Sequence, residues 1–300
     1  MVHLGLFYAQ ASSATNYDNG LDLFMPIAVG ITMLAVLYLL AKFLSVMFNF
    51  STSHVIGSKK FNHVEFRPKK ITEERKNILI KHFPYYQKLP PKSKHIFESR
   101  VVRFARLKAF KAKKNLVLTD EMVVFISASA VQLTFGLRDY RFLHFDRIEI
   151  YPEKFFSPRG KAYHLGETDA RNRVLRFSWV DFVKGYAIGD DNRNLGLHEF
   201  SHALFLNYLA GKKEDVHFDQ YYDQWKAEGS RQFFGLKKQD SHYIRNYAQT
   251  NLMEFFAVCV ECFFETPEQL FKLHAPIYLS IKKLLCQDPR ALNQQFKVKR

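Results

Sequence analysis

The segment that most restricts the fold is residues 193–207, with the sequence RNLGLHEFSHALFLN. It holds two histidines four residues apart, His198 and His202, in a run whose apolar residues recur at helical spacing. Positions i and i+4 share one face of a helix, so both imidazoles would point the same way and could bind one metal ion. Glu199 would lie where it can hold a water molecule at that metal. The segment therefore predicts a helix of the zinc hydrolase type, which needs a third ligand from elsewhere.

A candidate for the third ligand lies further along the chain. Asn251 is expected to cap an apolar helix that carries Glu254 in its first turn. An unpaired carboxylate in so apolar a setting is costly, and a metal ion would be one partner for it. The Asn251-x-x-Glu254 spacing also matches a capping box, which alone would explain a glutamate there. Beside the two histidines, metal ligation is the favoured interpretation. Glu261, just under two turns further on, is expected to orient a histidine, and it is the reserve candidate for the ligand.

The three cysteines are too few for a disulfide scaffold and odd in number, which favours a reducing compartment for the folded part. Two of them, Cys259 and Cys262, lie on the same apolar segment as Glu254. With no second pair nearby in the sequence, these two thiols are expected to be core residues rather than a second metal site.

An uncharged apolar run occupies residues 23–41, LFMPIAVGITMLAVLYLLA, and apolar character continues to Phe48. A helix of this length, at about 1.5 Å per residue, roughly matches a hydrocarbon core of about 30 Å. The residues before it contain no Lys or Arg, only Asp18 and Asp22, so the basic start of a signal peptide is lacking. The run predicts one transmembrane helix over residues 23–48, preceded by a short extracytoplasmic N-terminus at residues 1–22.

The charges on the two sides of this span predict its orientation. No basic residue precedes it, whereas Lys42, Lys59 and Lys60 follow it. By the positive-inside rule, the N-terminus should lie outside and the larger C-terminal part in the cytoplasm, as in a bacterial inner membrane. Residues 49–70, rich in polar and basic side chains, are interpreted as a juxtamembrane linker.

Nearly all of the net charge of +15 lies in residues 59–114, where eighteen Lys or Arg face four Glu. Such a block is typical of proteins that bind nucleic acid or an anionic membrane surface, and also of solvated helix faces. Because the block begins next to the predicted span, anionic lipid head groups are the expected partner and nucleic acid is the less favoured one.

The remaining pattern indicates an α+β fold, mostly helical with a small β-sheet, over residues 71–300. Helical periodicity dominates up to residue 137, and residues 147–151 and 173–179 then alternate like strands. The turn-like residues 160–172 between them are expected to join the two strands as a long hairpin. A strand pair directly before the metal helix suits a zincin-like metallopeptidase domain, because an edge strand can hold an extended peptide beside the metal.

These motifs together resemble the Mlc titration factor A (MtfA) family of zinc peptidases. The resemblance rests on residues 198–202, HEFSH, paired with Tyr247, with Thr250-Asn251 and with residues 254–258, EFFAV. Weaker apolar matches extend it over about residues 75–275, and a similar arrangement occurs at the active site of the anthrax lethal factor protease domain. The chain departs from the family in the charged residues 211–223 and in its membrane span, which is an addition to soluble members.

The resemblance implies a gluzincin zinc peptidase. In that arrangement His198, His202 and Glu254 bind Zn²⁺, Glu199 is the general base, and Tyr247 donates a hydrogen bond to the transition state. The expected substrate is a peptide or protein, and the choice between an aminopeptidase and an endopeptidase stays open. The alternative that the resemblance also offers is a regulatory protein with little peptidase activity that binds a transcriptional regulator or another protein. The presence of Glu199 and Tyr247 favours the enzyme, because binding alone needs no general base.

Overall fold

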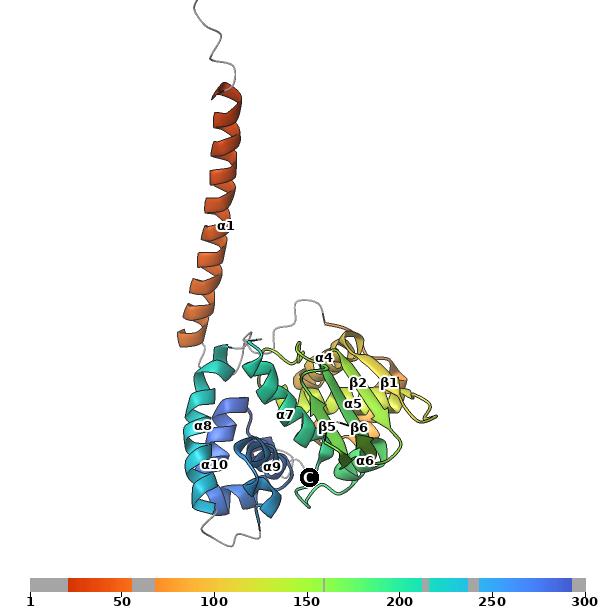
Figure 1. The fold of residues 1–300 in the computed structure, drawn as a ribbon. Helices are drawn as coiled ribbons and strands as arrows, with labels where there is room; N and C mark the ends of the chain where they lie inside the picture. Colours follow the sequence, from red (N-terminus) through yellow and green to blue (C-terminus); the bar gives the residue numbers. More distant parts are fainter. Residues whose placement is uncertain (1–20, 56–67, 159, 212–215, 237–242, 293–300) are drawn as a thin grey trace, which may run out of the picture. The chain divides into compact units, whose positions relative to one another are not determined.

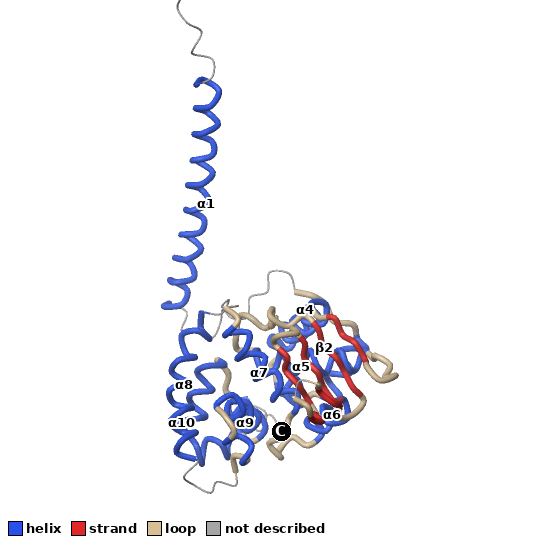
Figure 2. Tube along the Cα trace, viewed as in Figure 1, coloured by secondary structure: helices blue, strands red, loops and turns tan. Residues whose placement is uncertain are grey.

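The computed structural model describes residues 21–55, 68–158, 160–211, 216–236 and 243–292 (Figures 1 and 2). The chain divides into two compact units between residues 58 and 59. Each unit is described by itself below.

The N-terminal unit consists, in its described part, of the single helix α1 (Leu21–Val55). Within α1, the stretch Met25–Phe43 is apolar and none of it is buried in the protein. Among the residues that the structure describes, α1 is the one helix long and apolar enough to cross a membrane. By its length and composition, this apolar stretch matches the predicted span, which it overlaps.

The second unit begins with helices, continues with strands and ends with helices. Its helices are α2 (Glu73–His82), α3 (Pro84–Lys88), α4 (Pro91–Leu107), α5 (Asp120–Thr134), α6 (Trp179–Ala187), α7 (Leu195–Leu209), α8 (Val216–Leu236), the 3-10 helix η1 (Asn246–Gln249), α9 (Leu252–Glu265) and α10 (Pro267–Leu285). Its strands are β1 (Ala109–Ala112), β2 (Arg147–Tyr151), β3 (Phe155–Ser157), β4 (Ala162–His164), β5 (Gly166–Asp169) and β6 (Val174–Ser178). The predicted α+β class, mostly helical with a small sheet, is confirmed.

The main sheet has the strand order β1-β2-β6-β5, and β3 pairs with β4 in a separate two-stranded ribbon. Strands β1, β2 and β6 are parallel, whereas β5 is antiparallel to β6 and forms an edge of the sheet. Ile148, Ile150, Leu175 and Phe177 are all buried, as expected for strands near the centre of a sheet.

The predicted hairpin between β2 and β6 is wrong. These strands pair in parallel, with Arg147 opposite Val174 and Tyr151 opposite Ser178. A parallel pair needs a crossover connection, and the residues between the two strands fold into β3, β4 and β5 rather than into a turn. The antiparallel neighbour of β6 is therefore β5, which becomes the edge strand on the side of α7.

Alternation along the strands separates a charged face of the sheet from an apolar face. On the charged face, Arg176 of β6 donates to Glu149 at 3.0 Å, to Glu167 at 2.7 Å and to Asp169 at 3.3 Å. The opposite face carries Leu175 and Phe177 of β6. Their partners on the neighbouring strand β5 are Thr168 and Gly166, respectively. Because side chains alternate along a strand, Gly166 and Thr168 share the face that packs against α7.

Two cations of the basic block serve the core instead of the surface. Arg100 of α4 is 2% exposed and donates to the carbonyls of Phe135 and Leu137. Lys108, which follows α4, donates to the carbonyl of Phe142 at 2.9 Å, and burial lowers its pKa to about 8. The two side chains bind backbone carbonyls in the segment between α5 and β2. Part of the basic block is therefore not free for an anionic partner.

Helix α7 lies at the centre of the second unit, between the sheet on one side and α8, α9 and α10 on the other (Figures 1 and 2). Its buried Phe200 ring lies 5.5 Å from the ring of Phe177 and 5.4 Å from that of Phe142, measured between ring centroids. One side of α7 is therefore fixed against the sheet, and its other side faces α9.

Candidate metal centre

The N-terminus of α7 is fixed by Asn194. The Oδ1 atom of this residue accepts a hydrogen bond from Leu197 N at 3.0 Å, and its Nδ2 donates to the carbonyl of Gly185 at 3.0 Å. The first bond caps α7, and the second holds the start of the helix against α6. With Leu197 and Phe200 buried in the core, His198 and His202 lie on the side that faces α9.

The structure brings His198, His202 and Glu254 together. The His198 Nε2 atom lies 3.1 Å from His202 Nε2 and 3.1 Å from Glu254 Oε2. The other carboxylate oxygen of Glu254, Oε1, lies 3.4 Å from His202 Nε2. One ligand atom from each of the three residues falls within 4.8 Å of the others, close enough to hold one metal ion.

Helix α9 positions Glu254 through its own N-cap. The side chain of Asn251 accepts hydrogen bonds from Met253 N at 2.9 Å and from Glu254 N at 3.0 Å, as the sequence predicted. The Glu254 carboxylate points to the two imidazoles, so its observed partners are those expected of a metal ligand. The capping motif and the proposed ligand role coexist because the cap uses Glu254 N and the ligand role uses its carboxylate.

Two observations indicate that His198, His202 and Glu254 can hold a metal ion. Glu254 Oε2 is a buried atom that has no hydrogen-bond partner among the described residues. Two imidazole nitrogens and one carboxylate oxygen are the ligands of many catalytic zinc sites, which keep a further position open. The unsatisfied Oε2 atom lies beside His198 Nε2, on the side where a shared cation would satisfy it.

Glu261 lies on the other side of the His198 ring. Its Oε1 atom is 2.8 Å from His198 Nδ1 and accepts from Arg245 Nη2 at 2.6 Å. Its Oε2 atom accepts from Asn194 N at 2.6 Å. A carboxylate on Nδ1 holds a proton on that nitrogen, so Nε2 is the nitrogen that can bind a metal ion. The geometry favours the orienting role for Glu261 over the reserve role as a ligand.

The charges around the pair of histidines shift two pKa values. Burial lowers the pKa of His198, but the carboxylates of Glu254 and Glu261 outweigh burial and raise it to about 10. Burial alone would raise the pKa of Glu254, yet its contacts with His198 and His202 hold it well below its usual range. A metal ion that binds these atoms must displace the proton on Nε2, so binding is coupled to proton release.

Replacing Glu261 with Gln is expected to weaken zinc binding by about 10- to 100-fold, which is the usual cost of losing a partner that orients a ligand. The amide keeps the size of the side chain but loses the charge that holds the His198 Nδ1 proton and meets Arg245. Competition with a chromogenic chelator measures the affinity. Glu265→Gln, the same change one turn along α9, is the matched control, because the Glu265 carboxylate accepts from Arg193 N at 3.2 Å. Equal affinities for both variants would contradict the orienting role.

Glu199 faces β5 rather than α9. The residue is 6% exposed, and Thr168 Oγ1 donates to its Oε2 atom at 2.7 Å. Thr168 and Arg245 are contacts of the site that the sequence analysis missed. Neither belongs to a motif, because each reaches the site only through the pairing of strands or the fold of a loop.

The side chain of Tyr247 lies outside the described residues. Its backbone belongs to η1, which ends two residues before Asn251 and packs against α9. The donor role of Tyr247 therefore stays a prediction.

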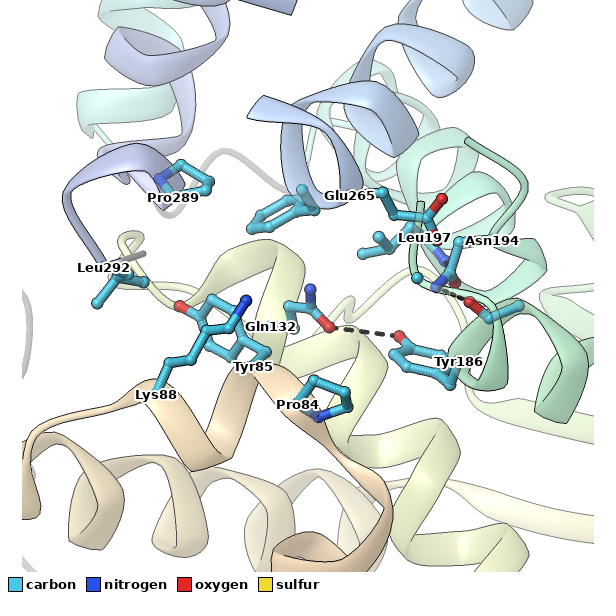
Figure 3. A pocket seen from close by; sticks show the side chains of 13 residues that line it. Pro84, Tyr85, Lys88, Gln132, Tyr186, Asn194, Leu197, Glu265, Pro289 and Leu292 are labelled. Carbon is cyan, nitrogen blue, oxygen red and sulfur yellow. Dashed lines mark hydrogen bonds between the residues drawn. The ribbon is translucent and has the colours of Figure 1, made fainter. Parts of the chain in front are cut away.

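A pocket of about 90 Å³ lies where the N-terminus of α7 and the C-terminus of α9 meet α3 (Figure 3). Tyr186, Asn194 and Glu265 line it, and none of the three candidate ligands does. Glu265 Oε2 accepts from Arg193 N at 3.2 Å, next to the Asn194 N–H that Glu261 accepts. Burial raises the pKa of Glu265 to about 8, and the carboxylates of Glu261 and Asp191 add to this rise.

The raised pKa of Glu265 predicts a pH-dependent stability. The folded chain holds this proton more tightly than the unfolded chain, so the free energy of unfolding falls as the pH rises from about 4.5 to about 8. Glu265→Gln cannot ionise, and its urea midpoint relative to the wild type should therefore rise between pH 5 and pH 9. Glu153→Gln, on the surface, controls for the substitution itself. A difference between Glu265→Gln and the wild type that does not change with pH would contradict the expectation.

Comparison with known proteins agrees with the geometry. The sequence profile of the family described as Glucose-regulated metallo-peptidase M90 matches residues 58–285. The chain is also 28% identical over 234 residues to the uncharacterized protein slr2042 of Synechocystis sp. (strain ATCC 27184 / PCC 6803 / Kazusa), across 71% of this chain and 83% of that protein. The profile match includes every candidate ligand and begins after α1. The chain belongs to the M90 family of metallopeptidases, the MtfA family that its motifs resemble.

Proposed function

We propose that this protein is a zinc-dependent peptidase of the gluzincin type, in which His198, His202 and Glu254 hold the metal. The observation that carries the proposal is the convergence of these three side chains, one ligand atom from each within 4.8 Å of the others. Membership of a metallopeptidase family supports the same conclusion. Two nitrogens and one carboxylate oxygen favour zinc over Mg²⁺ or Ca²⁺, which prefer oxygen ligands.

His198, His202 and Glu254 would hold a zinc ion, which would act as a Lewis acid on the scissile carbonyl and lower the pKa of a water molecule from about 16 toward 7. The Glu199 carboxylate takes a proton from this water and delivers it to the leaving amine, as a general base and then a general acid. Glu261, whose Oε1 atom lies 2.8 Å from His198 Nδ1, would hold a proton on that nitrogen. Tyr247 is assigned the hydrogen bond to the developing oxyanion.

The edge strand β5 is the proposed binding surface for the peptide substrate. It lies on the side of the sheet next to α7, and no described strand pairs with its outer edge. An extended peptide can add to such an edge through backbone hydrogen bonds. The peptide would then pass Glu199, which contacts Thr168 of the same strand.

We further propose that α1 anchors the peptidase in a membrane, with the second unit in the cytoplasm. The support is the length and composition of Met25–Phe43 and the basic residues that follow it. Basic side chains near the span would then contact anionic lipid head groups. Proteolysis of right-side-out and inverted membrane vesicles tests this topology. The second unit should be cleaved only in inverted vesicles, and cleavage in right-side-out vesicles would contradict the orientation.

Cleavage of a fluorogenic peptide library by the full-length protein tests the proposed activity. Hydrolysis should occur with the protein as purified, stop with 1,10-phenanthroline and return when zinc is added. A protein that holds zinc yet cleaves no peptide in the library would instead favour the alternative, a regulator that binds a protein partner.

A further inference from the structure

The side chain of Glu199 is held by the strand opposite its helix. Thr168 Oγ1 lies 2.7 Å from Glu199 Oε2 and 3.0 Å from the backbone carbonyl of the same residue. A hydroxyl has one proton, and the shorter distance directs it to the carboxylate oxygen. Among the described residues, Thr168 provides the one hydrogen bond to this carboxylate, so Oε1 has no hydrogen-bond donor.

The other carboxylate oxygen, Oε1, lies against Gly166. A Cβ atom built on Gly166 would come within 2.6 Å of Glu199 Oε1 and 2.7 Å of Glu199 Cγ. These distances are far inside van der Waals contact, and Leu195 Cδ1 would be equally close at 2.7 Å, so any side chain at this position would displace both the Glu199 carboxylate and Leu195. Gly166 is required here for close approach, and its φ angle is not in the left-handed region.

Strand geometry explains why these two residues act together. Gly166 and Thr168 are two positions apart on β5, so both lie on the face toward α7. Glu167, between them, faces the other way and binds Arg176 at 2.7 Å. The ion network on one face therefore fixes the strand, and the opposite face of the same strand meets Glu199.

We propose that Thr168 and Gly166 are positioning residues for the general base. Thr168 binds Oε2 and sets the plane of the carboxylate, while Gly166 provides the space that Oε1 needs. Oε1 is then the oxygen that receives the proton from water, and Thr168 can donate to Oε2 both before and after that transfer. This inference rests on the proposed function, because it gives Glu199 the role of general base.

The same contact joins the base to the proposed substrate strand. Backbone pairing of a peptide along β5 would place the substrate on the strand that holds Glu199. Substrate binding and alignment of the base are in this way coupled through a single short strand. A variant that misaligns Glu199 should therefore lower kcat more than it weakens substrate binding.

The test compares Thr168→Val, Thr168→Ser and Gly166→Ala in the full-length protein with one fluorogenic peptide selected from the library. Thr168→Val keeps the shape but replaces the hydroxyl with a methyl group, and kcat should fall by about 10- to 100-fold with KM within about threefold. Thr168→Ser restores the hydroxyl and should keep kcat within about threefold of the wild type. Gly166→Ala should lower kcat at least as much as Thr168→Val. The zinc content should be the same in all three variants.

Thr134→Val is the matched control. Its hydroxyl is buried in α5 and donates to the carbonyl of Ala130 at 2.8 Å, so the substitution removes an equivalent buried hydrogen bond outside the site. Its kcat should equal that of the wild type below its unfolding temperature. A kcat for Thr168→Val within twofold of the wild type, while Glu199→Gln is inactive, would overturn the inference and leave the proposed function intact.

A second measurement, which does not depend on peptide hydrolysis, tests the contact between Thr168 and Glu199. In thermal unfolding, Thr168→Val and Glu199→Ala should each lower the midpoint, and the double variant should lose clearly less than the sum because both remove the same contact. A wild type without chelator-sensitive cleavage would refute the proposed function. In that case, additive losses in the unfolding cycle would refute the Thr168–Glu199 contact, and non-additive losses would support it.

Discussion

Glu199→Gln is expected to abolish peptide hydrolysis while the protein keeps its zinc. The amide cannot take a proton from water, and general base catalysis typically contributes about 10²- to 10⁴-fold to the rate. Its carbonyl oxygen can still accept the hydrogen bond from Thr168, which reaches Glu199 Oε2 at 2.7 Å in the wild type. The fold and the three candidate ligands should therefore be unchanged. A loss of kcat of at least about 10²-fold with equal zinc content is the predicted result.

Glu153→Gln is the matched control for this prediction, because it makes the same change at an exposed position. Its turnover should equal that of the wild type. Full activity of Glu199→Gln would remove Glu199 from the role of general base. Loss of zinc from Glu199→Gln would show instead that Glu199 helps to hold the metal.

Glu254→Ala and His198→Ala are each expected to lose both zinc and activity. Either change leaves only two of the three donors, and catalytic zinc sites depend on three protein ligands. In Glu254→Ala, His198 retains Glu261 on Nδ1, so the imidazole stays oriented while the carboxylate ligand is gone. Metal analysis of the purified proteins should find less than a tenth of the zinc of the wild type in both variants.

His95→Ala controls for the removal of a histidine, because His95 lies on the surface of α4 with 78% of its side chain exposed. Its zinc content should match the wild type. Zinc retained by Glu254→Ala would transfer the ligand role to Glu261, against the placement of Glu261 on the Nδ1 side of His198.

The local features of the site could be predicted because each is encoded within a few residues. Histidines four residues apart on an apolar helix must share a face, and the structure places His198 and His202 side by side. Asn251 caps α9, as predicted, because its short polar side chain accepts from the first free N–H groups of the helix. Cys259 and Cys262 are buried in the core, as expected for thiols on an apolar helix.

The contacts that depend on strand pairing could not be predicted in the same way. Alternation identified residues 147–151 and 173–179 as strand-like but does not say whether two strands run parallel. The parallel pairing of β2 and β6 makes β5 the edge strand, and only then does Thr168 reach Glu199. The Arg245 contact with Glu261 likewise depends on the loop before η1, which carries no local signal.

The most direct test of the central claim is a zinc titration of the stripped wild-type protein. Chelation followed by removal of the chelator should leave a folded protein without peptidase activity. Added zinc should then restore hydrolysis in proportion to the metal bound and reach a plateau at one zinc per chain. Hydrolysis that survives complete removal of the metal, or zinc that binds at the His198–Glu254 site without restoring hydrolysis, would contradict the account.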